Sequence, residues 1–60
     1  MNFDKQYKEW QVACIEKCNE IYDTDFTLNN MEEEFEVCEH GAIHVYGGGW
    51  YEGLIPFSES

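Results

Sequence analysis

The fold is decided by residues 34–46, EFEVCEHGAIHVY, in which apolar and polar side chains alternate. Alternation with a period of two is typical of a β-strand that has one buried face. Gly41 interrupts the alternation and marks a turn, because glycine accepts backbone conformations that other residues avoid. The stretch therefore predicts two antiparallel strands joined as a hairpin.

Two loop lengths are possible for this hairpin. A two-residue loop, His40-Gly41, would pair Cys38 with Ile43 and would mix apolar and polar side chains on both faces. A three-residue loop over 39–41, with Gly41 in the left-handed bulge position, pairs Cys38 with Ala42. We predict the longer loop, because only this register gives one face that consists entirely of apolar side chains. That face consists of Phe35, Val37, Ile43 and Val45, and the outer face consists of Glu34, Glu36, Cys38, His44 and Tyr46.

The sequence after the hairpin predicts a third strand. Gly47-Gly48-Gly49 reverses the chain, and residues 50–55, WYEGLI, form a strand that Pro56 ends. Trp50 and Tyr51 then point to opposite faces, so one is expected in the core and the other on the surface. Residues 57–60, FSES, are expected to be loose.

The sequence before the hairpin predicts a long helix over residues 3–22. Its apolar side chains recur at intervals of three and four, which places them in one stripe along the helix. The stripe consists of Phe3, Tyr7, Trp10, Cys14, Cys18 and Ile21, widened by Ile15 and Tyr22. A short helical turn is expected near Asn29 or Asn30, with Phe26, Leu28 and Met31 beneath the core. The whole chain, 1–60, is predicted to form a single α+β domain, one N-terminal amphipathic helix packed on a three-stranded antiparallel β-sheet.

The charge distribution is the most informative feature for function. The chain has 13 acidic residues and three lysines, and its formal charge is −10. Residues 1–17 are neutral in sum, so the whole negative charge belongs to residues 18–60, which contain no base. Such a chain repels nucleic acid and anionic membranes, so we expect neither as a direct partner. An ordinary solvated surface mixes both signs, and we therefore favour a basic protein partner.

The acidic residues are expected to form rows. Side chains along a helix or strand repeat at about 6 Å, a spacing similar to that of successive phosphates. A surface of this kind can occupy a basic groove that binds DNA or RNA. The predicted partner-binding residues are Glu16, Glu20, Asp23, Asp25, Glu32, Glu33, Glu34, Glu36 and Glu39.

In its length, charge and helix-plus-hairpin plan, the chain resembles the small acidic DNA mimics encoded by phages, which include many anti-CRISPR and anti-restriction proteins. The resemblance rests on no shared motif. It implies a non-enzymatic inhibitor that occupies the DNA-binding cleft of a CRISPR-Cas or similar defence complex, without a cofactor, as a monomer or homodimer in the host bacterial cytoplasm. It also implies that the acidic residues between Glu16 and Asp25 and between Glu32 and Glu39 replace phosphates.

Two alternatives remain open. Cys14, Cys18, Cys38 and His40, with His44 nearby, could supply zinc ligands, although Cys14 and Cys18 lie in the predicted core stripe. The chain could also be an acidic accessory or antitoxin-like partner of a basic protein. The odd number of cysteines favours free thiols in a reducing cytosol. A Cys38–His44 nucleophile is disfavoured, since nearby acidic groups raise the pKa of a thiol.

Overall fold

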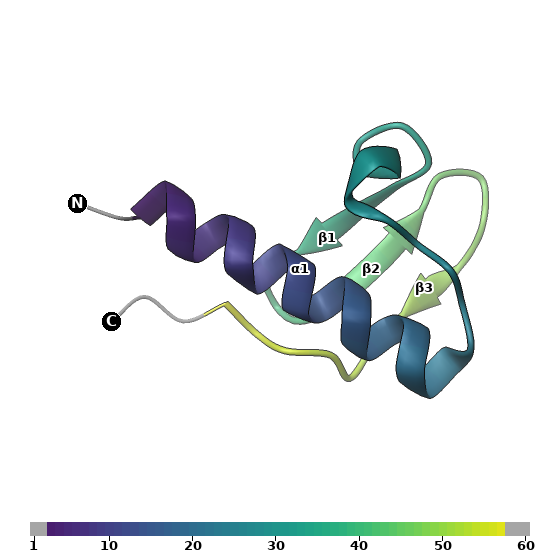
Figure 1. The fold of residues 1–60 in the computed structure, drawn as a ribbon. Coiled ribbons are helices and arrows are strands. Elements are labelled where there is room, and N and C mark those ends of the chain that lie inside the picture. Colours follow the sequence, from purple (N-terminus) through teal and green to yellow (C-terminus); the bar gives the residue numbers. More distant parts are fainter. Residues whose placement is uncertain (1–2, 58–60) are drawn as a thin grey trace.

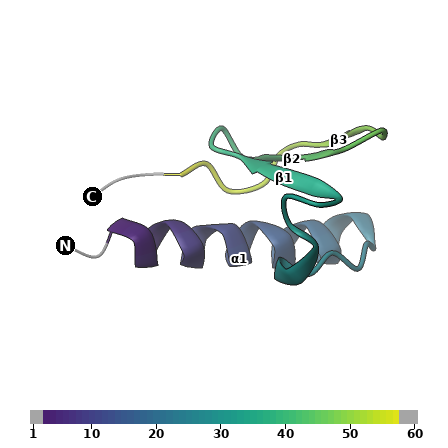
Figure 2. The ribbon, with the colours of Figure 1, turned by 90° about the horizontal axis from the view of Figure 1, so that it is seen from above.

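The computed structural model describes residues 3–57 of the chain. Helix α1 (Phe3–Tyr22) is followed by the short 3₁₀ helix η1 (Leu28–Asn30) and by strands β1 (Phe35–Cys38), β2 (Ala42–Val45) and β3 (Trp50–Tyr51). The strands form one antiparallel sheet in the order β1-β2-β3. Figure 2 shows two layers, with α1 covering one face of the sheet. The predicted α+β architecture is confirmed.

The hairpin has the predicted register. Val37 pairs with Ile43 and Cys38 pairs with Ala42 across β1 and β2. Gly41 closes the three-residue loop with a φ of 95°, and its N–H donates to the Cys38 carbonyl at 2.9 Å. A side chain is strained at this φ, so the turn depends on glycine.

The third strand is shorter than predicted. β3 contains two residues, which pair with Ile43 and His44. Gly53 then adopts a φ of 77° and turns the chain, and the N–H of Leu54 donates to the Gly41 carbonyl at 2.9 Å. Burial of the Leu54 side chain in the core explains why the chain leaves the strand before Pro56.

The core lies between α1 and the inner face of the sheet. Its buried side chains come from both layers and from the segment after β3: Trp10, Cys14, Ile15, Cys18, Phe35, Val37, Ile43 and Leu54. Phe26, Leu28 and Met31 pack against this cluster, as predicted. The predicted stripe side chain of Phe3 lies outside the described part of the structure.

The C-terminal end of α1 extends beyond the core. Ile21 is 51% exposed, so its predicted place in the core is wrong. Tyr22 is also exposed, but its hydroxyl donates to the Glu52 carbonyl at 2.8 Å. The physical reason is length: a 20-residue helix is about 30 Å long, whereas a four-residue strand covers about 13 Å. The sheet is therefore too short to cover every turn of the helix.

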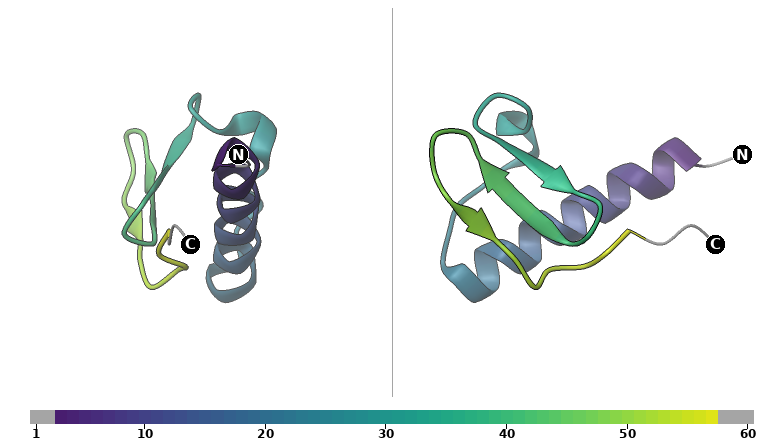
Figure 3. Two further views of the ribbon diagram at one scale, coloured as in Figure 1. Left: turned by 90° about the vertical axis from the view of Figure 1, so that its left-hand side faces the viewer. Right: turned by 180° about the vertical axis from the view of Figure 1, so that it is seen from behind.

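The segment after β3 extends the cover along the N-terminal half of α1, as Figures 1 and 3 show. The indole N–H of Trp10 donates to the Ile55 carbonyl, and the Cys14 thiol lies 3.2 Å from the same oxygen. Phe57 packs edge-on against Tyr7, with ring centroids 5.2 Å apart. The prediction of a loose end is thus wrong for Phe57, and residues 58–60 lie outside the described part.

Candidate partner-binding surface

The acidic side chains within residues 3–57 are all exposed. One ion pair occurs in this part of the chain: Glu36 Oε2 lies 3.6 Å from His44 Nδ1, which carries a charge only when protonated. The lysines on α1 form no salt bridge with the described carboxylates. The negative charge of residues 3–57 is therefore not neutralised by internal ion pairs and is available to a partner.

The layers of the fold distribute the predicted binding residues over separate regions. Glu16 and Glu20 are exposed on α1, and each follows a buried cysteine of the core stripe by two residues, so both lie on the helix side that faces away from the core. Glu36 lies on the outer face of β1, on the other side of the molecule. The structure thus places these three residues on two opposite faces, and the predicted residues do not form one continuous face.

The remaining predicted residues lie in turns. Asp23 follows the last residue of α1 with a φ of 56°, so it ends the helix and does not extend its acidic row. Asp25 lies in the loop that follows, Glu39 lies at the tip of the β1–β2 hairpin, and Glu32, Glu33 and Glu34 form the turn between η1 and β1. Figure 3 shows that the chain from 23 to 34 passes from the helix layer to the sheet layer along one edge.

A side-chain network shapes the loop that carries the two aspartates. The Asn19 side-chain amide donates to the Phe26 carbonyl at 2.9 Å, and its oxygen accepts the Phe26 N–H at 2.9 Å and the Thr24 hydroxyl at 2.7 Å. Sequence reasoning missed this role of Asn19. The available signal was an asparagine one turn before the predicted end of the helix, because asparagine side chains bond to nearby backbone groups.

The outer face of the sheet carries a group that sequence reasoning found only in part. We define the outer patch as Glu36, His40, His44, Tyr46 and Trp50. His44 stacks on Trp50 with ring centroids 4.4 Å apart and an interplanar angle of 19°. His44 also meets Tyr46 edge-on at 5.9 Å, and His40 lies 6.2 Å from Trp50. Trp50 is 51% exposed and Tyr46 is 45% exposed.

The outer patch lies in a negative field. Partial burial, with the carboxylates of Glu36 and Glu32, raises the pKa of the Tyr46 phenol above its ordinary value. Burial and then Glu36 raise the pKa of the Cys38 thiol. This second shift confirms the expectation that acidic neighbours disfavour a thiolate here.

A polar recess adjoins the outer patch at the β1 edge. Its volume is about 180 Å³, and it is lined by Tyr7, Gln11, Met31, Glu32, Glu36, Val37 and Tyr46. Glu36 and Tyr46 therefore border both the recess and the exposed aromatic rings. Carboxylates beside exposed aromatic rings suit contact with cationic side chains.

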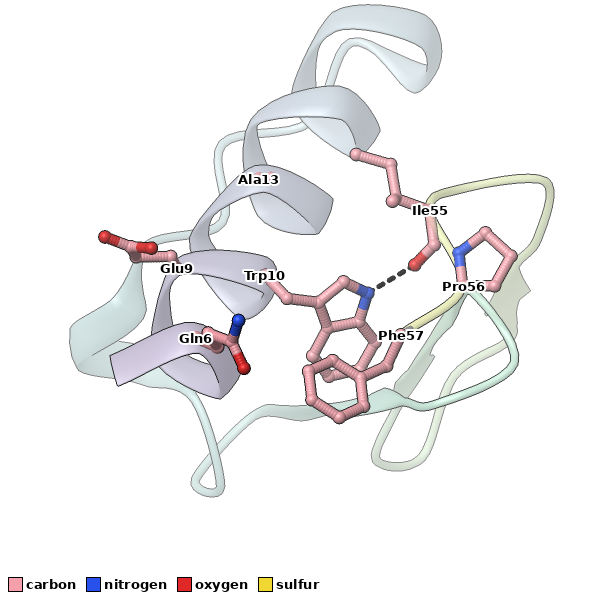
Figure 4. Close-up of a pocket in the computed structure, with 7 residues that line it drawn as sticks. All are labelled: Gln6, Glu9, Trp10, Ala13, Ile55, Pro56 and Phe57. Carbon is pink, nitrogen blue, oxygen red and sulfur yellow. Dashed lines mark hydrogen bonds between the residues drawn. The ribbon is translucent and has the colours of Figure 1, made fainter. Parts of the chain in front are cut away.

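A second, apolar cavity of about 370 Å³ lies between α1 and the segment after β3 (Figure 4). Trp10 extends across it toward the Ile55 carbonyl, with Phe57 against the indole, whereas the Glu9 carboxylate points away. Its inner wall is made of side chains that hold the C-terminal segment on the helix. We therefore infer that the side chains around this cavity stabilise the fold and do not form a binding site.

The cysteine sites do not gather with histidines. Cys14 and Cys18 are fully buried in the core, and burial raises the pKa of both thiols. Within residues 3–57, no group of three or more His, Cys, Asp or Glu side chains is placed to hold a metal ion. The zinc alternative therefore has no ligand set in the described structure.

Comparisons of the chain with protein-family models, with curated proteins and with solved structures find no match. No helix within the described residues is both long and apolar enough to span a bilayer. The functional argument therefore rests on the chemistry of the surface.

Proposed function

We propose that the protein is a non-enzymatic inhibitor whose acidic surface occupies the basic nucleic-acid-binding cleft of a CRISPR-Cas or similar prokaryotic defence complex. Occupation of the cleft blocks recognition of target DNA. The protein would act in the host bacterial cytoplasm and would bind a basic protein, not nucleic acid or a membrane.

The observation that supports this function is the unneutralised charge. The formal charge is −10 on 60 residues, every carboxylate side chain within residues 3–57 is exposed, and the only ion pair in that part involves a histidine. Like charges on a small domain oppose its compact state. A partner that supplies the missing positive charge removes this repulsion and gains a fast, electrostatically steered association.

The test is competition with DNA. Purified CRISPR effector complexes of several types are incubated with a labelled target duplex and rising amounts of the protein, and DNA binding is read by mobility shift. We expect at least one complex to lose its DNA, with an effect that weakens as the salt concentration rises.

A charge-reversal variant supplies the control. Glu33, Glu34 and Glu36 are replaced by Lys, all at exposed positions, so the fold is retained while inhibition is lost. A partner that binds the protein and its DNA at the same time would contradict mimicry. That result would favour the accessory or antitoxin-like role instead.

A further inference from the structure

The outer patch places two exposed aromatic side chains, Tyr46 and Trp50, beside a carboxylate on the uncovered face of the sheet. Half of Trp50 and nearly half of Tyr46 remain accessible although both rings contact His44. Exposed aromatic side chains beside polar groups are enriched at binding sites, because they provide a large contact area with little loss of conformational freedom. The opposite sheet face is already covered by α1 (Figure 2).

Charge complementarity indicates that a positively charged partner binds this surface. The carboxylates of Glu36 and Glu32 lie close enough to Tyr46 to raise the pKa of its phenol. The three lysines of the chain all lie on α1, in the other layer. A second copy of the chain is disfavoured as the partner, because two molecules of charge −10 repel each other.

Arginine fits the outer patch better than lysine. A guanidinium group is planar, stacks on an indole or phenol ring and donates two parallel hydrogen bonds to a carboxylate. An ammonium group is a compact, strongly hydrated charge and gains less from an aromatic surface. The outer patch offers a carboxylate and an aromatic ring on either side of His44, because His44 pairs with Glu36 on β1 and with Trp50 on β3.

We infer that the outer patch is the docking surface of the inhibitor and that it binds an arginine-rich segment of the partner's nucleic-acid-binding cleft. This inference rests on the proposed function. It places the contact with the partner on the outer face of the sheet and not on the helix face that carries Glu16 and Glu20. The carboxylates of Glu16 and Glu20 on the opposite helix face contribute through long-range attraction only.

The experiment uses two probes of equal charge, a labelled octa-arginine peptide and a labelled octa-lysine peptide, and fluorescence anisotropy at about 0.1 M salt. We expect the wild-type chain to bind octa-arginine about three- to fivefold more tightly than octa-lysine. Trp50→Ala abolishes this preference while the affinity for octa-lysine changes less than twofold. Trp50→Leu serves as a second variant, which keeps apolar bulk without an aromatic face.

A matched pair of variants tests the choice of face. Glu36→Gln and Glu16→Gln remove the same charge from exposed positions on opposite layers. We expect Glu36→Gln to weaken octa-arginine binding about threefold and Glu16→Gln to weaken it less than 1.5-fold. Equal affinities for the two peptides, a preference that survives both Trp50 variants, or equal losses in the two glutamine variants would overturn the inference.

These outcomes are independent of the DNA competition. A chain that inhibits a defence complex but shows no arginine preference retains the proposed function and loses the docking surface. A chain with the arginine preference that displaces no DNA retains the docking surface and loses mimicry.

Discussion

The contact between Trp10 and the C-terminal segment offers a sharp test of the fold. Trp10 is 7% exposed, its indole N–H donates to the Ile55 carbonyl, and its ring lies 5.2 Å from that of Phe57. Trp10→Phe keeps an aromatic ring at this position but removes the donor and part of the ring. We expect the C-terminal segment to loosen and the whole domain to lose stability.

The loss can be estimated from two contributions. The hydrogen bond contributes about 0.5–1.5 kcal/mol, and the removed ring atoms contribute about 1–2 kcal/mol through lost burial and incomplete repacking. The sum is about 1.5–3.5 kcal/mol, against a total of roughly 3–9 kcal/mol for a domain of this size. The midpoint of thermal unfolding should fall by about 10–20 °C.

The chain contains its own control, because its second tryptophan is exposed. Trp50→Phe is the same substitution at a position that is 51% accessible, and we expect a change within about 0.5 kcal/mol. Both variants are unfolded in urea and followed by far-UV circular dichroism. If Trp10→Phe costs no more than Trp50→Phe, the contact with Ile55 does not hold the C-terminal segment in place.

Three further predictions concern the turns and a thiol. Gly41→Ala should cost about 1–3 kcal/mol, because φ is 95° and a Cβ would lie about 3.1 Å from backbone of the C-terminal segment; Gly49→Ala, where a Cβ meets nothing within 4 Å, is the control in urea unfolding. Asn19→Ala should cost about 1.5–4.5 kcal/mol through its three lost hydrogen bonds and should increase hydrogen exchange in the loop after α1, whereas an unchanged exchange rate would contradict this role. Alkylation of Cys38 by iodoacetamide should accelerate with rising pH, and Glu36→Gln should make it faster at pH 8, because removal of a negative neighbour lowers the pKa of the thiol; equal rates would show that Glu36 does not act on it.

The hairpin could be predicted in detail because local patterns determine it. Only one register places Phe35 and Val37 on the same apolar face as Ile43, and Gly41 supplies the backbone conformation that this register needs. The helix could be predicted for the same reason, since its apolar stripe repeats over five turns. Both elements are specified by residues close together in the sequence.

The errors in the fold prediction share a cause, which is contact between distant parts of the chain. Ile21 continues the stripe of α1, but the sheet is too short to reach it. Leu54 lies in the predicted strand over residues 50–55, yet the chain leaves the sheet after Tyr51 and the Leu54 side chain fills the core. Phe57 packs against a helix 50 residues earlier in the chain, and no local pattern reveals such a contact.

The candidate surface was predictable in its chemistry and less so in its geometry. Composition alone indicates an unneutralised acidic protein, and every predicted acidic residue is exposed. The pattern on β2 placed His44 on the outer face, but the stack with Trp50 depends on the register of β3 across the loop of three glycines. Several loop lengths fit a glycine-rich turn, so this register is fixed by packing rather than by local sequence.

The division of the acidic residues sets a requirement on any competition with nucleic acid. A formal charge of −10 spread over the longest dimension of the molecule, 34 Å, is about one charge per 3.4 Å, which equals the charge density of one DNA strand and half that of a duplex. Glu16 and Glu20 lie on the layer opposite Glu36, so a single face presents less than this density to a partner. Electrostatic attraction by one face alone is therefore weaker than that of the nucleic acid it must replace. A successful competitor needs contacts that DNA backbone does not make, and the exposed rings of Trp50 and Tyr46 are the groups on the sheet face that can supply them.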